Sequence, residues 1–194
     1  DPRAYLAMLN ADGSVDTNFN TAAGPNAAVN AAYAQSDGKL VVLGSFTAIN
    51  GAAVTRIARL NADATVDPTF ASGGGVLSSL GYIVPQADGK LLLGGNGVTT
   101  FTYAGVTRNG LVRINPDGTA DQAFSPPSFN GAVEFFAVQR DGKIVVGGSF
   151  TTLAGATQNR IARLNADGTP DSAFNTNLGT GANSSIVSIA IQPA

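Results

Sequence analysis

Cysteine, histidine and tryptophan are absent from this chain, and glutamate (Glu134) and methionine (Met8) each occur once. Without cysteine no disulfide, thiolate nucleophile or cysteine-ligated metal site can form, and without histidine the commonest general base and transition-metal ligand is missing. A serine triad therefore cannot assemble, and Glu134 has no second unique carboxylate to pair with for glycoside hydrolysis. These absences predict a protein that is not an enzyme and needs no cofactor.

Charge is scarce as well. The formal net charge is −2, the pI is near 4.8, and the sequence contains no run of lysine or arginine. Neither the basic footprint of nucleic-acid binding nor a polybasic membrane patch is present. No apolar run approaches the roughly 18 to 20 residues that span a bilayer. We expect no nucleic-acid partner and no membrane insertion. Because the sequence starts at Asp1 without an initiator methionine, we expect a fragment or a processed chain.

Two motifs recur along the chain. Gln-x-Asp-Gly-Lys occurs at residues 35–39, 86–90 and 139–143. A second motif, Asn-x-Asp-(Gly)-x-x-Asp-x-x-Phe, starts at Asn10, Asn61, Asn115 and Asn165, with spacings of 51, 54 and 50 residues. A period of this length, built on a unit too small to bury its own faces, is typical of a propeller or a solenoid.

The best-preserved unit, Gln139 to Phe174, predicts four strands. The turn residues Asp-Gly-Lys predict a hairpin between 133–139 and 143–150. Residues 160–165 alternate charged with apolar side chains, as a half-buried third strand does. Residues 171–174 are too short for a helix and suit a short outer fourth strand.

The predicted fold is therefore all-β: a β-propeller-type array of four-stranded antiparallel blades with a period of about 51 residues. The chain forms one array (1–194) with three complete blades and a split fourth. The complete blades cover 27–71, 76–125 and 131–175, residues 1–20 supply strands three and four of a partial blade, and residues 184–194 supply a first strand.

This strand count leaves the split blade without a second strand, so a self-contained four-bladed ring would be one strand short. Unpaired strand edges invite pairing with further units or subunits. We expect the missing strand to come from a longer parent chain or from a neighbouring chain, so that a protein partner, by self-association or within one polypeptide, completes the array.

The second unit departs from its neighbours. It reads Gly95-Asn96-Gly97-Val98 where the others read Gly-Ser-Phe-Thr, and the glycine that follows comes three residues later. The loop contains Phe101 and Tyr103. A longer, more aromatic loop is where repeat proteins often place a binding contact, so Asn96, Phe101 and Tyr103 form a candidate binding loop, although local packing of the two rings is the simpler interpretation.

Nearly all aspartates occupy repeated turn positions, where the side chain can hydrogen-bond its own backbone two residues on. Calcium is the alternative, because Asn-x-Asp-Gly-x-x-Asp overlaps the middle of an EF-hand loop. However, the position of the first EF-hand aspartate holds Met8 or one of three arginines, Arg59, Arg113 and Arg163. We therefore predict no metal site and expect each arginine to pair with a loop aspartate.

The combination of QRDGKIVVGGSFT and RIARLNADGTPDSAF resembles the delta-60 repeat, a bacterial family of units of roughly fifty to sixty residues. The resemblance covers nearly the whole chain and implies β-propellers in large, often secreted or surface-anchored proteins. It supplies no catalytic residues. Departures are Ala64 at a turn glycine, Gly110 where Arg56 and Arg160 stand, and the unit around Asn96.

Two functions follow as expectations. The first is a non-catalytic structural or adhesive module of a bacterial surface or secreted protein, which acts as a scaffold for protein contacts or self-assembly. The second is a propeller that binds a carbohydrate or peptide, with its site on one mouth of the ring. A low-charge array with no reactive side chains suits an extracellular location, and a glycan is the possible ligand of the second function.

The first testable prediction concerns metal. The Asn-x-Asp loops lack two carboxylates of an EF-hand cage, so their turns must be held by hydrogen bonds from aspartate side chains. Thermal unfolding with and without EDTA should therefore give the same Tm. A fall of many degrees on chelation would show that the loops hold a structural ion.

Overall fold

The computed structural model describes residues 4–19, 24–71, 81–95, 97 and 100–192. It consists almost entirely of short antiparallel strands joined by tight turns, as the sequence predicted. Its one α-helix among these residues, α1 (Ser172–Asn177), is less than two turns long. No helix in the described part of the chain is long and apolar enough to cross a membrane.

Three antiparallel sheets form the blades, and each contains a first, second and third strand in that spatial order. The blades comprise β1 (Val29–Ala34), β2 (Leu40–Gly44) and β5 (Ile57–Leu60); β6 (Tyr82–Pro85), β7 (Leu91–Gly94) and β10 (Leu111–Ile114); β11 (Val133–Val138), β12 (Ile144–Gly148) and β15 (Ile161–Leu164). The middle strand of every blade is buried along its whole length because it packs on both faces.

Each Asp-Gly-Lys motif forms the turn between the first and second strands, which confirms the predicted hairpins. In the third blade the N–H of Gln139 donates to the carbonyl of Lys143 at 2.7 Å, and Gly142 adopts a φ of +80°. The side chain of Asp141 accepts the N–H of Lys143 at 3.1 Å. The aspartate side chain and the glycine of the motif thus stabilise the backbone conformation of the turn.

A second, smaller hairpin follows the middle strand of each blade, and the sequence reading did not anticipate it. These hairpins are β3 (Ala48–Ile49) with β4 (Ala52–Ala53), β8 (Thr100–Tyr103) with β9 (Val106–Asn109), and β13 (Thr152–Leu153) with β14 (Ala156–Thr157). Asn50 and Gly51 have φ values of 51° and 81°. Two consecutive positive values define a type I′ turn, for which Asn-Gly is the strongest short signal.

The residue before each third strand has a positive φ: 66° at Arg56, 69° at Arg160 and 71° at Gly110. A side chain with a Cβ is strained in this region, whereas glycine is not. The glycine of the second blade, a departure from the repeat, therefore fits the backbone at this position better than the arginines of its neighbours.

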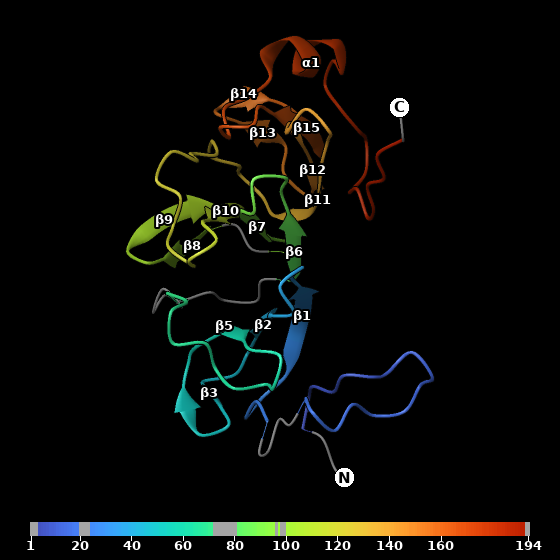
Figure 1. The fold of residues 1–194 in the computed structure, drawn as a ribbon. Coiled ribbons are helices and arrows are strands. Elements are labelled where there is room, and N and C mark those ends of the chain that lie inside the picture. Colours follow the sequence, from blue (N-terminus) through green and yellow to red (C-terminus); the bar gives the residue numbers. More distant parts are fainter. Residues whose placement is uncertain (1–3, 20–23, 72–80, 96, 98–99, 193–194) are drawn as a thin grey trace.

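The blades follow one another in an open arc, from blade one at the bottom of Figure 1 to blade three at the top. The first strands β1, β6 and β11 come successively into contact along one side of the arc, as inner strands of a propeller do. The N-terminal segment projects from one end of the arc, and the chain after α1 runs back along the other end.

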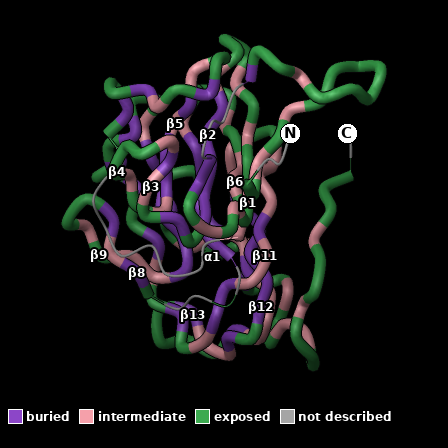
Figure 2. The backbone as a smooth tube through the Cα atoms, turned by 90° about the horizontal axis from the view of Figure 1, so that it is seen from below, coloured by how far each residue is buried: buried purple, intermediate pink, exposed green. Residues whose placement is uncertain are grey.

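Three apolar clusters form the core. One joins the first two blades, one joins the second and third, and one lies between the N-terminal segment and blade one. Figure 2 shows the buried residues along the strands, while exposed residues occupy the surrounding loops and both ends of the chain. The core therefore lies at the interfaces between units, as expected for units that cannot bury their own faces.

The predicted fourth strands are wrong in detail. Residues 67–70 and 121–124 form turns, and α1 begins directly after Asp171 in the third blade. One isolated bridge in each blade pairs the segment with the end of the third strand: Leu60 to Val66, Ile114 to Ala120 and Leu164 to Pro170. The reason is that Asp171 and its counterparts turn their side chains inward to ion pairs, which redirects the backbone after one paired residue.

The partial blade at the two ends does not form strands either. The N-terminal unit keeps a single bridge, Leu9 to Val15, and residues 186–192 belong to no sheet. Ile186 and Ile189 instead cover Gly147 of β12. A strand needs a hydrogen-bonded neighbour, and the second strand that would pair with both segments is missing from the described residues.

Candidate functional site: the junctions between blades

The same cluster of charged side chains occurs in all three blades, at the outer edge of the third strand. In blade one, Asp67 accepts Lys39 at 2.7 Å and the Nε of Arg59 at 2.8 Å. The guanidinium carbon of Arg59 lies 4.9 Å from the ring centre of Phe70. The equivalent sets are Lys90, Arg113, Asp121 and Phe124 in blade two, and Lys143, Arg163, Asp171 and Phe174 in blade three. The predicted pairing of these arginines with loop aspartates is confirmed.

The clusters keep their aspartates ionised. The hydrogen bonds from Lys39 and Thr69 hold the pKa of Asp67 well below its usual range, and those from Lys143 and Arg163 lower the pKa of Asp171 to about 2. Burial alone would raise the pKa of Asp121, but the bonds from Lys90 and Arg113 outweigh it and lower the pKa. These carboxylates are fixed anions, which suits a structural role and not proton transfer at neutral pH.

The first aspartate of each Asn-x-Asp loop holds its own turn, as the sequence predicted. Asp117 accepts the N–H of Thr119 at 2.9 Å and its hydroxyl at 2.7 Å. Asp12, Asp63 and Asp167 make the same pair of bonds to the residue two positions on. In the described part of the chain, no group of three or more acidic side chains is placed to hold a metal ion.

Each cluster also reaches the next blade. Arg59 donates an Nη1 hydrogen to the carbonyl of Pro116 at 2.7 Å, in the Asn-x-Asp turn of blade two. Arg113 makes the equivalent bond to the carbonyl of Ala166 in blade three. The residue after the cluster phenylalanine adds a backbone bond, from Ala71 to Asp117 at 2.8 Å and from Ser125 to Asp167 at 3.1 Å. One blade thus holds the turn of the next by two hydrogen bonds.

The turn glycine is packed tightly at both of these junctions. A Cβ on Gly118 would lie 2.6 Å from the carbonyl oxygen of Ala71 and 2.9 Å from the ring of Phe70. A Cβ on Gly168 would lie 3.0 Å from the ring of Phe124. Both glycines also have a positive φ, +85° and +92°. Glycine is required there for the turn and for the close approach of the preceding blade.

The junction between the N-terminal unit and blade one is of a different, apolar kind. Met8 stands where the other units have arginine, and Ala64 stands where their partners have glycine. Ala64 and Phe19 are buried in one cluster, and Met8 packs against that cluster. At this junction apolar contact takes the place of the hydrogen bond that an arginine would donate to the turn.

Among the described residues no Asn-x-Asp turn follows blade three, and its arginine cluster forms different hydrogen bonds there. Arg163 donates Nη1 to the side-chain oxygen of Gln139 in its own blade, at 3.2 Å. In blades one and two the corresponding oxygens of Gln35 and Gln86 have no hydrogen-bond partner. The N–H of Asn175, which corresponds to that of Ala71, donates within α1 to Asp171 at 3.0 Å.

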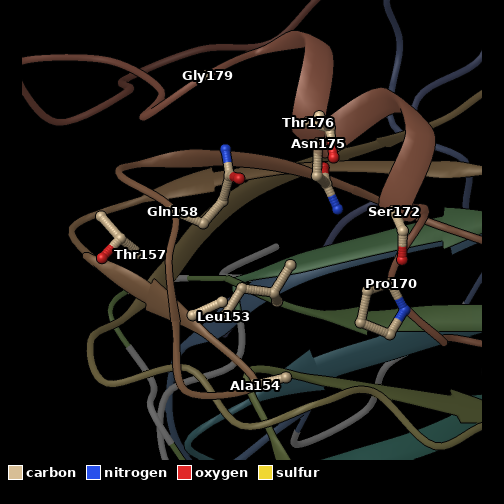
Figure 3. Close-up of a pocket in the computed structure, with 10 residues that line it drawn as sticks. Leu153, Ala154, Thr157, Gln158, Pro170, Ser172, Asn175, Thr176 and Gly179 are labelled. Carbon is tan, nitrogen blue, oxygen red and sulfur yellow. The ribbon is translucent and has the colours of Figure 1, made fainter.

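A pocket of about 360 Å³ lies beside this free end, between the β13–β14 hairpin and α1 (Figure 3). Its two buried amides are already engaged. Gln158 donates to the carbonyl of Ile161 at 2.9 Å, and Asn175 forms two bonds with the backbone of Arg163, at 2.7 and 3.0 Å. Both amides therefore hold the edge of β15, and the lining also carries the hydroxyls of Thr157, Ser172 and Thr176.

The candidate binding loop is not assembled at the surface. Phe101 and Tyr103 lie on β8 and are 4% and 0% exposed, in the cluster that joins blades one and two. The Tyr103 hydroxyl points to the carbonyls of Ala71 and Gly118 at the junction, and burial raises its pKa. Asn96 lies outside the described residues. The two rings fill space between blades, so the surface contact expected of them is not available.

Sequence comparison places the chain in a family. The model described as "Domain of unknown function (DUF5122) beta-propeller" matches residues 35–70, 86–124 and 139–174, more than half of the chain. This protein is a β-propeller repeat protein, and it belongs to that family. The match agrees with the delta-60 resemblance, under a different name. No curated protein and no solved structure matches the chain.

The tight packing of the junction glycines can be measured with a matched pair of variants. Gly118→Ala and Gly51→Ala place a methyl group at similar φ values, +85° and +81°, but Gly51 has no atom within 4 Å of the added Cβ. Backbone strain should cost both variants about 1 kcal/mol. Gly118→Ala should lose a further 1–3 kcal/mol, roughly, because it forces two blades apart. Urea unfolding measures the difference, and equal losses would contradict the junction geometry.

The ion pairs make stability depend on pH at the acid end. The pKa of Asp171 is lowered from 3.8 to about 2 in the folded state, so its contribution is present above pH 4 and is lost as the pH falls towards 2. Asp171→Asn, which keeps the helix cap, should have a lower Tm than wild type at pH 7, and the two values should converge near pH 2. Asp37→Asn, in an exposed hairpin turn, is the control. A constant difference across this range would contradict the assignment.

Proposed function

We propose that this chain is a non-catalytic repeat scaffold of a secreted or cell-surface bacterial protein, which carries protein contacts and self-assembly. The supporting observation is that the charged side chains repeated in every blade form ion pairs and hydrogen bonds within the array. All three lysines and three of the arginines bond to buried aspartates or to the neighbouring turn. A scaffold needs such repeated bonds, whereas an enzyme needs unique groups that are free to react.

The alternative of a carbohydrate or peptide site has less support. Such a site needs unsatisfied polar groups and aromatic surface on one concave face. Phe101 and Tyr103 are buried, and the amides beside the pocket at α1 are bonded to backbone. No further observation on the described residues favours a glycan over a protein as the partner.

A cell-display experiment tests the scaffold role. Bacteria that display the chain on their surface should aggregate with one another, or bind other proteins, in a manner that free sugars do not inhibit. The purified chain should bind no member of a glycan array above background. Cells that display no insert are the control. If one class of glycan bound saturably and that sugar abolished aggregation, the scaffold hypothesis would be rejected in favour of carbohydrate binding.

A further inference from the structure

The N-terminal Asn-x-Asp turn has no contact with a preceding blade among the described residues. Residues 10–15 are all exposed, and this segment projects from the end of the arc (Figure 1). Gly13 has the φ of a junction glycine, +86°, but an added Cβ would meet nothing within 4 Å. Its counterparts Gly118 and Gly168 are packed against the preceding blade. The turn therefore has the junction conformation without the junction contacts.

The other half of a junction is open at blade three. Arg163 still stacks on Phe174, with the guanidinium carbon 3.8 Å from the ring centre compared with 4.9 and 4.7 Å in the other blades, and still forms a salt bridge to Asp171 at 2.8 Å. The Arg163 side chain is 19% exposed, compared with 9% for Arg113, whose junction is filled. Its Nη1 group donates a hydrogen bond to the side-chain oxygen of Gln139, in the same blade, instead of to a following turn.

The exposed turn at residues 10–13 has the same sequence as a turn that a junction arginine binds. Residues 10–13 read Asn-Ala-Asp-Gly, and residues 165–168 read the same four amino acids. The latter turn accepts the bond from Arg113 through the carbonyl of Ala166. Ala11 offers the same carbonyl in the same turn, which is closed by a bond from Gly13 to Asn10 at 2.9 Å.

We propose that the turn at residues 10–13 of one molecule docks onto Arg163 and Phe174 of a second copy, head to tail. This inference rests on the proposed function, since it names the surface and the partner through which the scaffold assembles. The two contacting surfaces differ, so the interface is heterologous and builds a ring or a filament according to the rotation between copies.

A second copy fits better than the same chain. The projecting turn lies at one end of the arc and β15 at the other (Figure 1), so the two halves lie apart within the described residues of one copy. The end-to-end arrangement also gathers exposed apolar side chains into one composite blade. Leu9 and Val15 of one copy are 61% and 45% exposed, and Val187 of the other is 74% exposed.

Docking requires two local changes at blade three, and both have precedents in the molecule. Arg163 exchanges its hydrogen bond to the Gln139 side-chain oxygen for one to the carbonyl of Ala11. The Gln139 oxygen then has no hydrogen-bond partner, as is already the case for Gln35 and Gln86. The N–H of Asn175 leaves α1 and donates to the carbonyl of Asp12, as those of Ala71 and Ser125 do at filled junctions. The first turn of α1 therefore loosens when the junction forms.

Charge complementarity supports the pairing. The positive charge of the preceding blade's arginine contributes to the lowered pKa of Asp117 and of Asp167, after the bonds from Thr119 and Thr169. The pKa of Asp12 is lowered chiefly by its bonds to Ser14, and no arginine contributes. Docking would supply that cation, so association should weaken as salt is added.

Two variants, each disabling one half of the junction, form the test. Gly13→Asn keeps the turn, because asparagine tolerates a positive φ, but places an amide where a junction leaves no room. Arg163→Met copies the natural Met8 and removes the donor. Gly51→Asn is the matched control, at a positive φ outside any junction. Sedimentation velocity over a range of protein concentrations measures association, and circular dichroism checks that each variant is folded.

Wild type and Gly51→Asn should associate with the same affinity, and each junction variant should raise the Kd at least tenfold. A mixture of Gly13→Asn with Arg163→Met should recover dimers but no larger species, because one intact junction remains between the two. Two outcomes would overturn the inference alone: association unchanged in both variants, or no recovery in the mixture. A monomeric wild type would overturn it together with self-assembly, while binding to other proteins would leave the scaffold role standing.

Discussion

The bond between the arginine of one blade and the turn of the next is the interaction on which the array depends. A single guanidinium binds the aspartate of its own blade, stacks on the phenylalanine of its own blade and donates to a carbonyl of the following blade. Only a planar group with several donors can serve three partners at once, and a lysine ammonium could not replace it. Correct folding of one blade therefore orients the group that positions the next.

The junction also explains why the repeats keep residues that do no chemistry. The lysine of the hairpin turn lies beside the arginine and balances the buried aspartate, while the turn glycine permits close approach. Where the arginine is replaced by Met8, the partner turn has changed to Ala64 and contact becomes apolar. Ala64 belongs to an apolar cluster against which Met8 packs, so this interface is apolar on both sides.

Sequence reasoning could predict most of what local turn chemistry and charge decide within a unit, although it missed the fate of the fourth strand. The period, the Asp-Gly-Lys hairpins, the third strands and the pairing of Arg59 with an aspartate all follow from local turn chemistry and charge. The β3–β4 hairpin could also have been found from Asn50-Gly51. The burial of Tyr103 could not, because a long aromatic loop looks alike whether it faces solvent or a neighbouring blade. Contacts between units decide that question, and they depend on the assembled arc.

The clearest case of such dependence is the segment after the cluster phenylalanine. Its three copies begin alike, yet among the residues that the structure describes only the third forms a helix. At Ala71 and Ser125 the backbone N–H is taken by the turn of the following blade, whereas at Asn175 no turn is present in this structure and the N–H closes a helical bond instead. The local sequence contributes as well, because Gly73 to Gly75 follow shortly after Ala71 and Pro126 follows Ser125, whereas residues 172–177 contain neither glycine nor proline. The helix at this end of the array therefore reflects both its own sequence and the Asn175 N–H, which no following turn accepts among the described residues.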